Sequence, residues 1–116
     1  MPKVLIVDDN AQTLQTLTFL LTPAGYQCFA AKTPIEARSA FIMERPDLAI
    51  LDHGLPGEDG ATLASTLKRL GSIKILMLTG RATLEKPHAV DLLLYKPQEP
   101  RAILEAVAAL LNPVQT

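Results

Sequence analysis

Five polar side chains follow directly after apolar stretches of the sequence, and their types could do chemistry together. Two adjacent acids follow residues 4–7, a third acid follows residues 48–51, and a threonine and a lysine follow two later stretches. Apolar runs without polar alternation are typical of strands that are buried on both faces, as in a parallel sheet. The five residues are Asp8, Asp9, Asp52, Thr79 and Lys96.

These residue types are those of a phosphoryl-transfer site. Carboxylates that lie close together repel one another, so at least one pKa should rise unless a cation is bound. An oxygen-only cluster suits Mg²⁺, a hard cation that keeps several of its waters. Lys96 is a compact positive charge that can meet an anion, and the Thr79 hydroxyl can donate a hydrogen bond to it. Asp52 would be the nucleophile, because carboxylates can form aspartyl phosphates.

A repeated strand–helix pattern must position these side chains. Such alternation predicts a parallel sheet with helices on both faces, and five strands favour the flavodoxin-like order 2-1-3-4-5. In that order the first and third strands, which both end in acids, are neighbours where the strand order reverses. Strands are expected at residues 4–7, 26–30, 48–51, 73–78 and 90–95, and helices after Asn10, after Thr33, from Asp59 or Gly60, and from about Gln98 to Leu111.

The composition is that of one globular domain. The 116 residues, 48% of them hydrophobic, suffice for a single core. A net charge of −1 without a basic run argues against direct nucleic-acid contact. Cys28 is the single cysteine, which excludes an internal disulfide. The first residues do not form a signal peptide and no stretch is long enough to span a bilayer, so a cytoplasmic location is expected.

Over essentially its whole length, residues 1–116, the chain resembles a single receiver domain of two-component response regulators, of the chemotaxis-regulator type. The resemblance rests on four motifs, each at a strand end and in the same order along the chain. They are Val-Asp-Asp at 7–9, Leu-Asp-His-Gly-Leu-Pro-Gly-Glu-Asp-Gly at 51–60, Leu-Thr-Gly at 78–80 and Lys-Pro at 96–97. Each motif alone is weak evidence, but the four together are specific.

The resemblance implies a role for each matching residue. Asp52 is expected to be the phosphoacceptor, with Thr79 and Lys96 binding the phosphoryl oxygens. The implied cofactor is Mg²⁺, and the implied phosphoryl donor is a phosphohistidine on a sensor histidine kinase or a histidine phosphotransfer protein. The Lys96–Pro97 peptide bond is expected to be cis. The implied metal ligands are Asp8, Asp9, Asp52 and the backbone carbonyl of Gly54.

Three classes of function are weighed. The leading one is a phosphorylatable signalling switch that is no classical enzyme but catalyses its own phosphorylation and dephosphorylation. The alternative is a phosphate-independent docking module on the receiver fold. A haloacid-dehalogenase-type phosphatase is disfavoured, because Asp8-Asp9-Asn10 lacks the Asp-x-Asp spacing of that class. The output is open: the chain is either a stand-alone receiver or a receiver cut from a longer regulator near Asn112-Pro113-Val114.

The connection before the fifth strand departs from the family. If the fifth strand starts near Asp91, only residues 80–90 separate it from the fourth strand, and a crossover with its helix needs at least about ten to twelve residues. Pro87 would interrupt a helix there. A turn at Thr83 to Lys86 is compatible with this spacing, but a helix of three turns is not. We therefore predict a short or irregular fourth helix, mobile without phosphate, and an unusual output surface.

Four further positions bear on switching. The family's switch aromatic normally lies three residues before the lysine, where this chain has Leu93. Tyr95 lies one residue before the lysine and, by strand alternation, is on the same face as Leu93. Two family positions that gate water are Gly54 and Arg81 here, so the phosphoryl lifetime is predicted to differ from that of typical receivers. Glycine cannot shield or position water, whereas arginine can pair with the phosphoryl group, so these effects can oppose each other.

Overall fold

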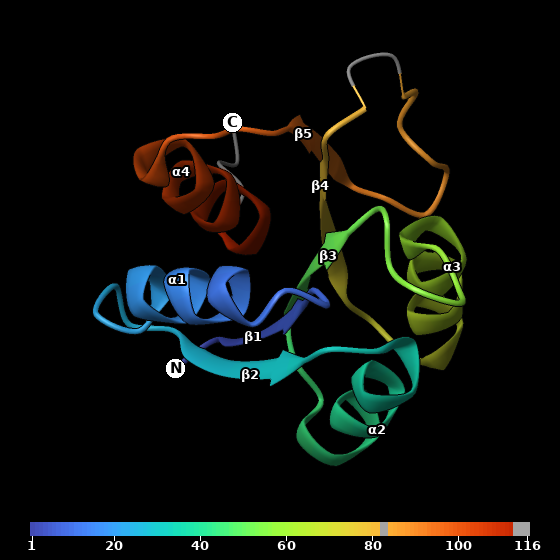
Figure 1. Cartoon of the computed structure of the whole chain (residues 1–116). Coiled ribbons are helices and arrows are strands. Elements are labelled where there is room, and N and C mark those ends of the chain that lie inside the picture. Colours follow the sequence, from blue (N-terminus) through green and yellow to red (C-terminus); the bar gives the residue numbers. More distant parts are fainter. Residues whose placement is uncertain (82–83, 113–116) are drawn as a thin grey trace.

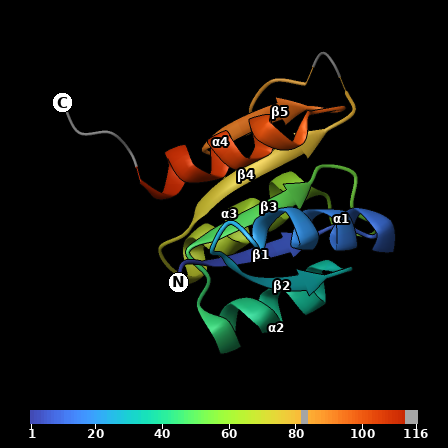
Figure 2. The ribbon, with the colours of Figure 1, turned by 90° about the vertical axis from the view of Figure 1, so that its left-hand side faces the viewer.

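The computed structural model describes residues 1–81 and 84–112, which form nine helices and strands. The parallel sheet has the order β2-β1-β3-β4-β5, with the strand arrows pointing the same way in Figure 2. The predicted fold class is therefore confirmed. In chain order the elements are β1 (Lys3–Val7), α1 (Ala11–Leu21), β2 (Gln27–Ala31), α2 (Pro34–Glu44), β3 (Leu48–Asp52), α3 (Gly60–Leu70), β4 (Lys74–Thr79), β5 (Leu92–Tyr95) and α4 (Pro100–Leu111).

The strands are continuously apolar because helices cover both faces of the sheet (Figure 1). Alternate strand residues point to opposite faces. Leu5 and Leu51 belong to the cluster under α2 and α3, whereas Ile6 and Ile50 belong to the cluster under α1 and α4. Burial on both sides therefore removes the polar alternation that a half-exposed strand would show.

Side-chain caps fix the starts of three helices. The Asn10 side chain accepts hydrogen bonds from the backbone N–H groups of Gln12 and Thr13, and the Thr33 hydroxyl accepts one from the N–H of Glu36. Asp59 caps α3 in the same way. These caps satisfy N–H groups that have no partner within the helix. The helix starts after Asn10 and Thr33 and at Gly60 agree with the expectations.

The fourth connection has no helix in its described residues, 80–81 and 84–91, so the prediction of a short or irregular fourth helix is confirmed. Its described part is held by local contacts: the Lys86 ammonium and the Val90 N–H bind the carbonyls of Val90 and Pro87, respectively. Thr83, where a predicted turn begins, lies outside the described residues, as do residues 113–114 of the expected boundary. Without a helix in this connection, the last helix carries the label α4 (Figure 1).

The fifth strand begins at Leu92, slightly later than the expected start at Val90 or near Asp91. The Asp91 carboxylate accepts the Ile75 N–H at 2.7 Å and also binds the Lys68 ammonium at 2.7 Å. Burial raises the pKa of Asp91, but these hydrogen bonds and the positive charge of Lys68 outweigh it, so the pKa is lowered. The Asp91 carboxylate thus satisfies the Ile75 N–H, while the Asp91 N–H donates to the Ile75 carbonyl at 2.9 Å, and the regular strand begins at Leu92. None of the described helices has the length and apolar character needed to cross a membrane.

Candidate functional site

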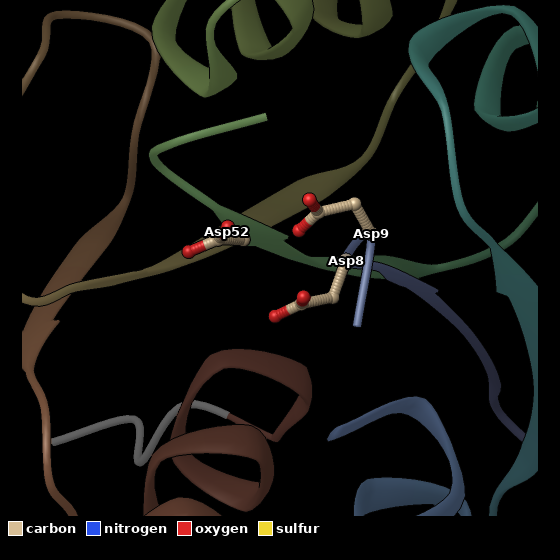
Figure 3. A group of neighbouring side chains, drawn as sticks. All are labelled: Asp8, Asp9 and Asp52. Carbon is tan, nitrogen blue, oxygen red and sulfur yellow. The ribbon is translucent and has the colours of Figure 1, made fainter. Parts of the chain in front are cut away.

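Three carboxylates converge at the carboxyl edge of the sheet (Figure 3). Asp8 and Asp9 follow β1, and Asp52 is the last residue of the neighbouring strand β3. Each offers an oxygen, and these oxygens lie within 4.8 Å of one another. Asp8 is buried and Asp9 is exposed, whereas the Asp52 side chain is 13% exposed. The adjacent-strand geometry thus unites residues that are more than 40 positions apart in the sequence.

Lys96 supplies the positive charge at this edge. Its ammonium nitrogen lies 2.9 Å from Oδ1 of Asp52 and 3.9 Å from Oδ2 of Asp8. The lysine follows β5, and the Lys96–Pro97 peptide bond is cis. The lysine side chain is 39% exposed, so it reaches the carboxylates from the solvent side. One lysine therefore faces a cluster of three acids.

The pKa of Asp8 is raised above its usual value. Burial is the largest cause, and the negative charges of Asp52 and Asp9 act in the same direction. The hydrogen bond from the Asn10 N–H, 2.9 Å from Oδ1 of Asp8, and the charge of Lys96 both lower it in part. Mutual repulsion, the cause inferred from the sequence, thus contributes less than the removal of Asp8 from water.

Thr79 ends β4 beside these acids and is 1% exposed. Its hydroxyl oxygen accepts a hydrogen bond from the Arg81 N–H at 3.0 Å, and its carbonyl accepts one from the Lys96 N–H at 2.6 Å. The Leu78 residue before it pairs with Asp52 across β3 and β4. The sheet register therefore places the threonine one residue beyond the level of Asp52.

The loop after Asp52 leaves one side of that carboxylate open. A Cβ built on Gly54 would lie 4.0 Å from Oδ2 of Asp52, so a side chain there would stand beside this oxygen. The buried Leu55 side chain anchors the next position of the loop in the core. Gly54 and Arg81 are both exposed. That Gly54 and Arg81 gate water stays a prediction. The role of the Gly54 carbonyl as a metal ligand also stays a prediction.

The two candidate switch residues have different surroundings. Leu93 is partly buried and packs against the core cluster under α2 and α3. Tyr95 is 41% exposed, and its hydroxyl donates to the Leu84 carbonyl at 2.8 Å. No local pattern in the sequence indicates this contact, because its partners are 11 residues apart. The Asn10 contact to Asp8 was also missed, although Asp-x-Asn is a recognisable turn sequence.

A cavity lies at the amino edge of the sheet. It has a volume of about 680 Å³ and is lined by Asp47 and Lys74, at the amino ends of β3 and β4, together with residues of α4. The candidate site is a cluster of charges at the opposite edge of the sheet. A small anion and a hydrated cation need no deep pocket.

The carboxylate set fits Mg²⁺, because it offers only hard oxygen donors. A bound cation would also offset the burial and the repulsion that raise the pKa of Asp8. We expect Mg²⁺ at ten times its Kd to stabilise the fold by about 1.4 kcal/mol and to raise the Tm by roughly 5 °C. Thermal unfolding with and without MgCl₂ at matched ionic strength would measure this. Asp9→Asn should abolish most of the gain, and an undiminished gain in that variant would contradict the metal assignment.

Comparisons with known proteins agree with this geometry. A family profile described as "Response regulator receiver domain" matches residues 4–108. The phosphate regulon transcriptional regulatory protein PhoB of Pseudomonas aeruginosa is 34% identical, over 94% of this chain and 51% of PhoB. The DNA-binding response regulator MtrA of Mycobacterium tuberculosis H37Rv is 30% identical, over 95% of this chain and 50% of MtrA. The chain spans about half the length of these curated relatives.

Solved structures support the same family assignment. A CheY-like receiver domain protein from Methanospirillum hungatei superposes with a TM-score of 0.90 at 30% identity, over 97% of this chain and 94% of that one. The response regulator TrrA from Thermotoga maritima, in complex with Mg(2+)-BeF, has a TM-score of 0.87 at 29% identity, over 96% of this chain and all (100%) of that one. With the family profile covering residues 4–108 and the predicted strand order present, the chain belongs to the response regulator receiver domain family.

Proposed function

We propose that this chain is a phosphorylation-controlled signalling receiver whose phosphoacceptor is Asp52. The observation that carries the proposal is the cluster of Asp8, Asp9 and Asp52 with the Lys96 ammonium 2.9 Å from Asp52. Acids, a lysine and a threonine hydroxyl at one sheet edge match the needs of phosphoryl transfer, in which positioning and charge stabilisation do most of the catalysis. The proposed donor is a phosphohistidine on a sensor histidine kinase or a histidine phosphotransfer protein.

In the proposed reaction, an Asp52 carboxylate oxygen attacks the phosphorus atom of the donor. An O–P bond forms, the P–N bond of the phosphohistidine breaks, and its electron pair stays on the imidazole nitrogen. Lys96 would leave its ion pair with Asp52 to bind a phosphoryl oxygen, and Thr79 would donate its hydroxyl hydrogen to another. Mg²⁺, when held by Asp8, Asp9 and Asp52, would neutralise charge on the transferring group. Hydrolysis of the aspartyl phosphate by water would restore the carboxylate.

The proposal extends to the place and context of the switch. A single receiver domain is proposed for residues 1–116, acting in the cytoplasm, where a kinase would reach its exposed carboxyl edge. By their names, PhoB is a transcriptional regulatory protein and MtrA is a DNA-binding response regulator. This chain matches about half of each, so the output partner stays open. Its net charge of −1 favours signalling through a protein or a further domain over direct DNA contact.

The test is phosphorylation by a small-molecule donor. The chain incubated with Mg²⁺ and acetyl phosphate should gain the mass of one phosphoryl group, and Asp52→Asn should not, because an amide is a poor nucleophile for this step. Glu105→Gln is the matched control, since it removes one charge from an exposed side chain of α4 that pairs with Arg101 and not with the carboxylate cluster. Equal labelling of Asp52→Asn and the wild type would contradict the proposal.

The same experiment distinguishes the proposed switch from the docking-module alternative. A module that works without phosphate should show no mass gain and no response to Mg²⁺ with beryllofluoride, a mimic of the phosphoryl group. A wild-type chain that fails both tests would support that alternative over the switch.

A further inference from the structure

Helix α2 is apolar on two opposite faces. Its inner face contributes Ala37 and Phe41, which are 0% and 1% exposed, to the core cluster beneath it. On its outer face, Ile35, Ile42 and Met43 are 69%, 58% and 79% exposed. The other four large hydrophobic side chains that are exposed in the described part of the chain lie on four different segments. Single exposed hydrophobic residues are normal, whereas a cluster of them marks a surface that another molecule covers.

The exposed residues of α2 form one stripe along the helix. Residues spaced by three, four or seven positions lie on the same side of an α-helix, so Ile35, Ser39 and Ile42 follow one line, with Met43 one turn beyond Ser39. Ser39 is exposed as well. Both views of the ribbon place α2 at the outside of the molecule, beside the edge strand β2 (Figure 1 and Figure 2). We call these four residues the outer stripe of α2.

The charged side chains of α2 are already paired within the protomer. Nη1 of Arg38 contacts both carboxylate oxygens of Glu58, at 3.2 and 3.0 Å. The Glu36 carboxylate accepts a hydrogen bond from the backbone before the helix at 3.2 Å, and the Glu44 carboxylate lies 3.8 Å from the Lys3 ammonium. A partner on the outer stripe would therefore bury no unpaired charge of α2. An anionic membrane is disfavoured as that partner, because it attracts helices with several free cations, and the one arginine of α2 is paired.

The outer stripe has nearly the same residue pattern in both directions along the helix. An isoleucine stands at each end, two helical turns apart, and the small Ser39 lies between them. A second α2 in antiparallel orientation presents the same pattern, so that Ile35 of each copy meets Ile42 of the other. The serine at the crossing point lets the two helices approach closely. We propose that the outer stripe is a self-association surface, at which two copies of this chain pair α2 with α2 antiparallel about a two-fold axis.

The size of the outer stripe makes this dimer weak. Burying one of its large side chains removes on the order of 100 Å² from water. Three such side chains give roughly 300 Å² per protomer, compared with about 800 Å² per partner in a standard stable interface. The Kd of the dimer is therefore expected to be on the order of 0.1 mM. This association needs no phosphoryl group, so it does not depend on the proposed function of Asp52.

Sedimentation equilibrium of the whole chain tests the dimer, at concentrations from about 20 µM to about 1 mM that bracket the expected Kd. Ile42→Glu should weaken association at least about ten-fold, because a two-fold contact buries the new carboxylate twice. Ile42 is 58% exposed, so the variant should fold, and circular dichroism would verify it. Phe19→Glu is the matched control: it places the same acid at an exposed hydrophobic position of α1 and should dimerise like the wild type.

A mixing experiment tests the antiparallel arrangement. Ile35→Lys and Ile42→Glu should each dimerise poorly alone, because each places a charge against an isoleucine in both halves of the contact. Mixed in equal amounts, the two variants should associate at least about ten-fold more tightly than either alone, since lysine then meets glutamate and isoleucine meets isoleucine. A parallel pair would set each position against itself, and mixing would recover no affinity.

The measurements decide between self-association and other occupants of the outer stripe. A wild-type chain that stays monomeric over the whole concentration range would overturn the proposal and leave the stripe to a different protein. A dimer that Ile42→Glu leaves intact, or that Phe19→Glu weakens equally, would overturn it as well, and so would a mixture that recovers no affinity. A dimer that is lost in Ile42→Glu, kept in Phe19→Glu and recovered on mixing supports the inference.

Discussion

Replacing Gly60 by alanine is expected to lower the free energy of unfolding by about 3 kcal/mol, near the upper end of overpacking costs. An alanine Cβ would lie 2.5 Å from the Asp52 carbonyl oxygen and 3.1 Å from both Cα of His53 and Cε of Met77. Two of these three atoms, including the nearest one, belong to the backbone and cannot rotate away as a side chain can. The Gly60 N–H also donates to the His53 carbonyl at 3.0 Å, so relief of the clash would strain this bond.

Chemical denaturation of Gly60→Ala would measure this loss. Gly80→Ala is the control, since a Cβ at Gly80 meets no atom within 4 Å, and its stability should remain within about 0.5 kcal/mol of the wild type. A Gly60→Ala variant as stable as Gly80→Ala would show that the loop after Asp52 adapts easily. The expected loss of stability would instead show that the start of α3 is packed tightly against the proposed phosphoacceptor.

Replacing Lys96 by methionine is expected to slow phosphorylation of Asp52 by roughly 10²- to 10³-fold, the usual cost of removing one group that stabilises transition-state charge. The Lys96 ammonium lies 2.9 Å from Asp52, the only salt bridge from a lysine or arginine to this carboxylate in the described residues 1–81 and 84–112. The fold should survive, because a pair whose lysine side chain is 39% exposed contributes at most about 1 kcal/mol.

Rates of labelling by acetyl phosphate at saturating Mg²⁺ would measure this effect, with circular dichroism to verify folding. Lys32→Met removes an exposed lysine outside the carboxylate cluster and should label at the wild-type rate. A Lys96→Met rate within a few-fold of wild type, in a folded variant, would show that the lysine plays no part in transfer.

The departures from expectation have identifiable causes in contacts between distant residues. Just before the fifth strand, which starts at Leu92, the Asp91 carboxylate accepts the Ile75 N–H and also binds Lys68. An acid before an apolar run does not by itself reveal such partners. In the same way, burial is the largest cause of the raised pKa of Asp8, and burial depends on the packing of the whole sheet edge.

The sequence by itself determined the strand order, the helix caps and the sheet edge at which the acids meet. These features follow from local patterns: buried strands read as apolar runs, Asn10 and Thr33 cap helices, and parallel strands direct their carboxyl ends to one edge. The short connection with Pro87 could also be predicted from the sequence, since chain length and proline geometry limit a helix directly.

Only the tertiary structure decided the distances within the site and the connection to it. The 2.9 Å contact of Lys96 with Asp52, and the bond from Tyr95 to Leu84, join residues 44 and 11 positions apart. The closeness of Gly60 to the Asp52 carbonyl likewise depends on how α3 packs against β3. Such contacts depend on how helices and strands pack in three dimensions, and no periodicity along the chain records that packing.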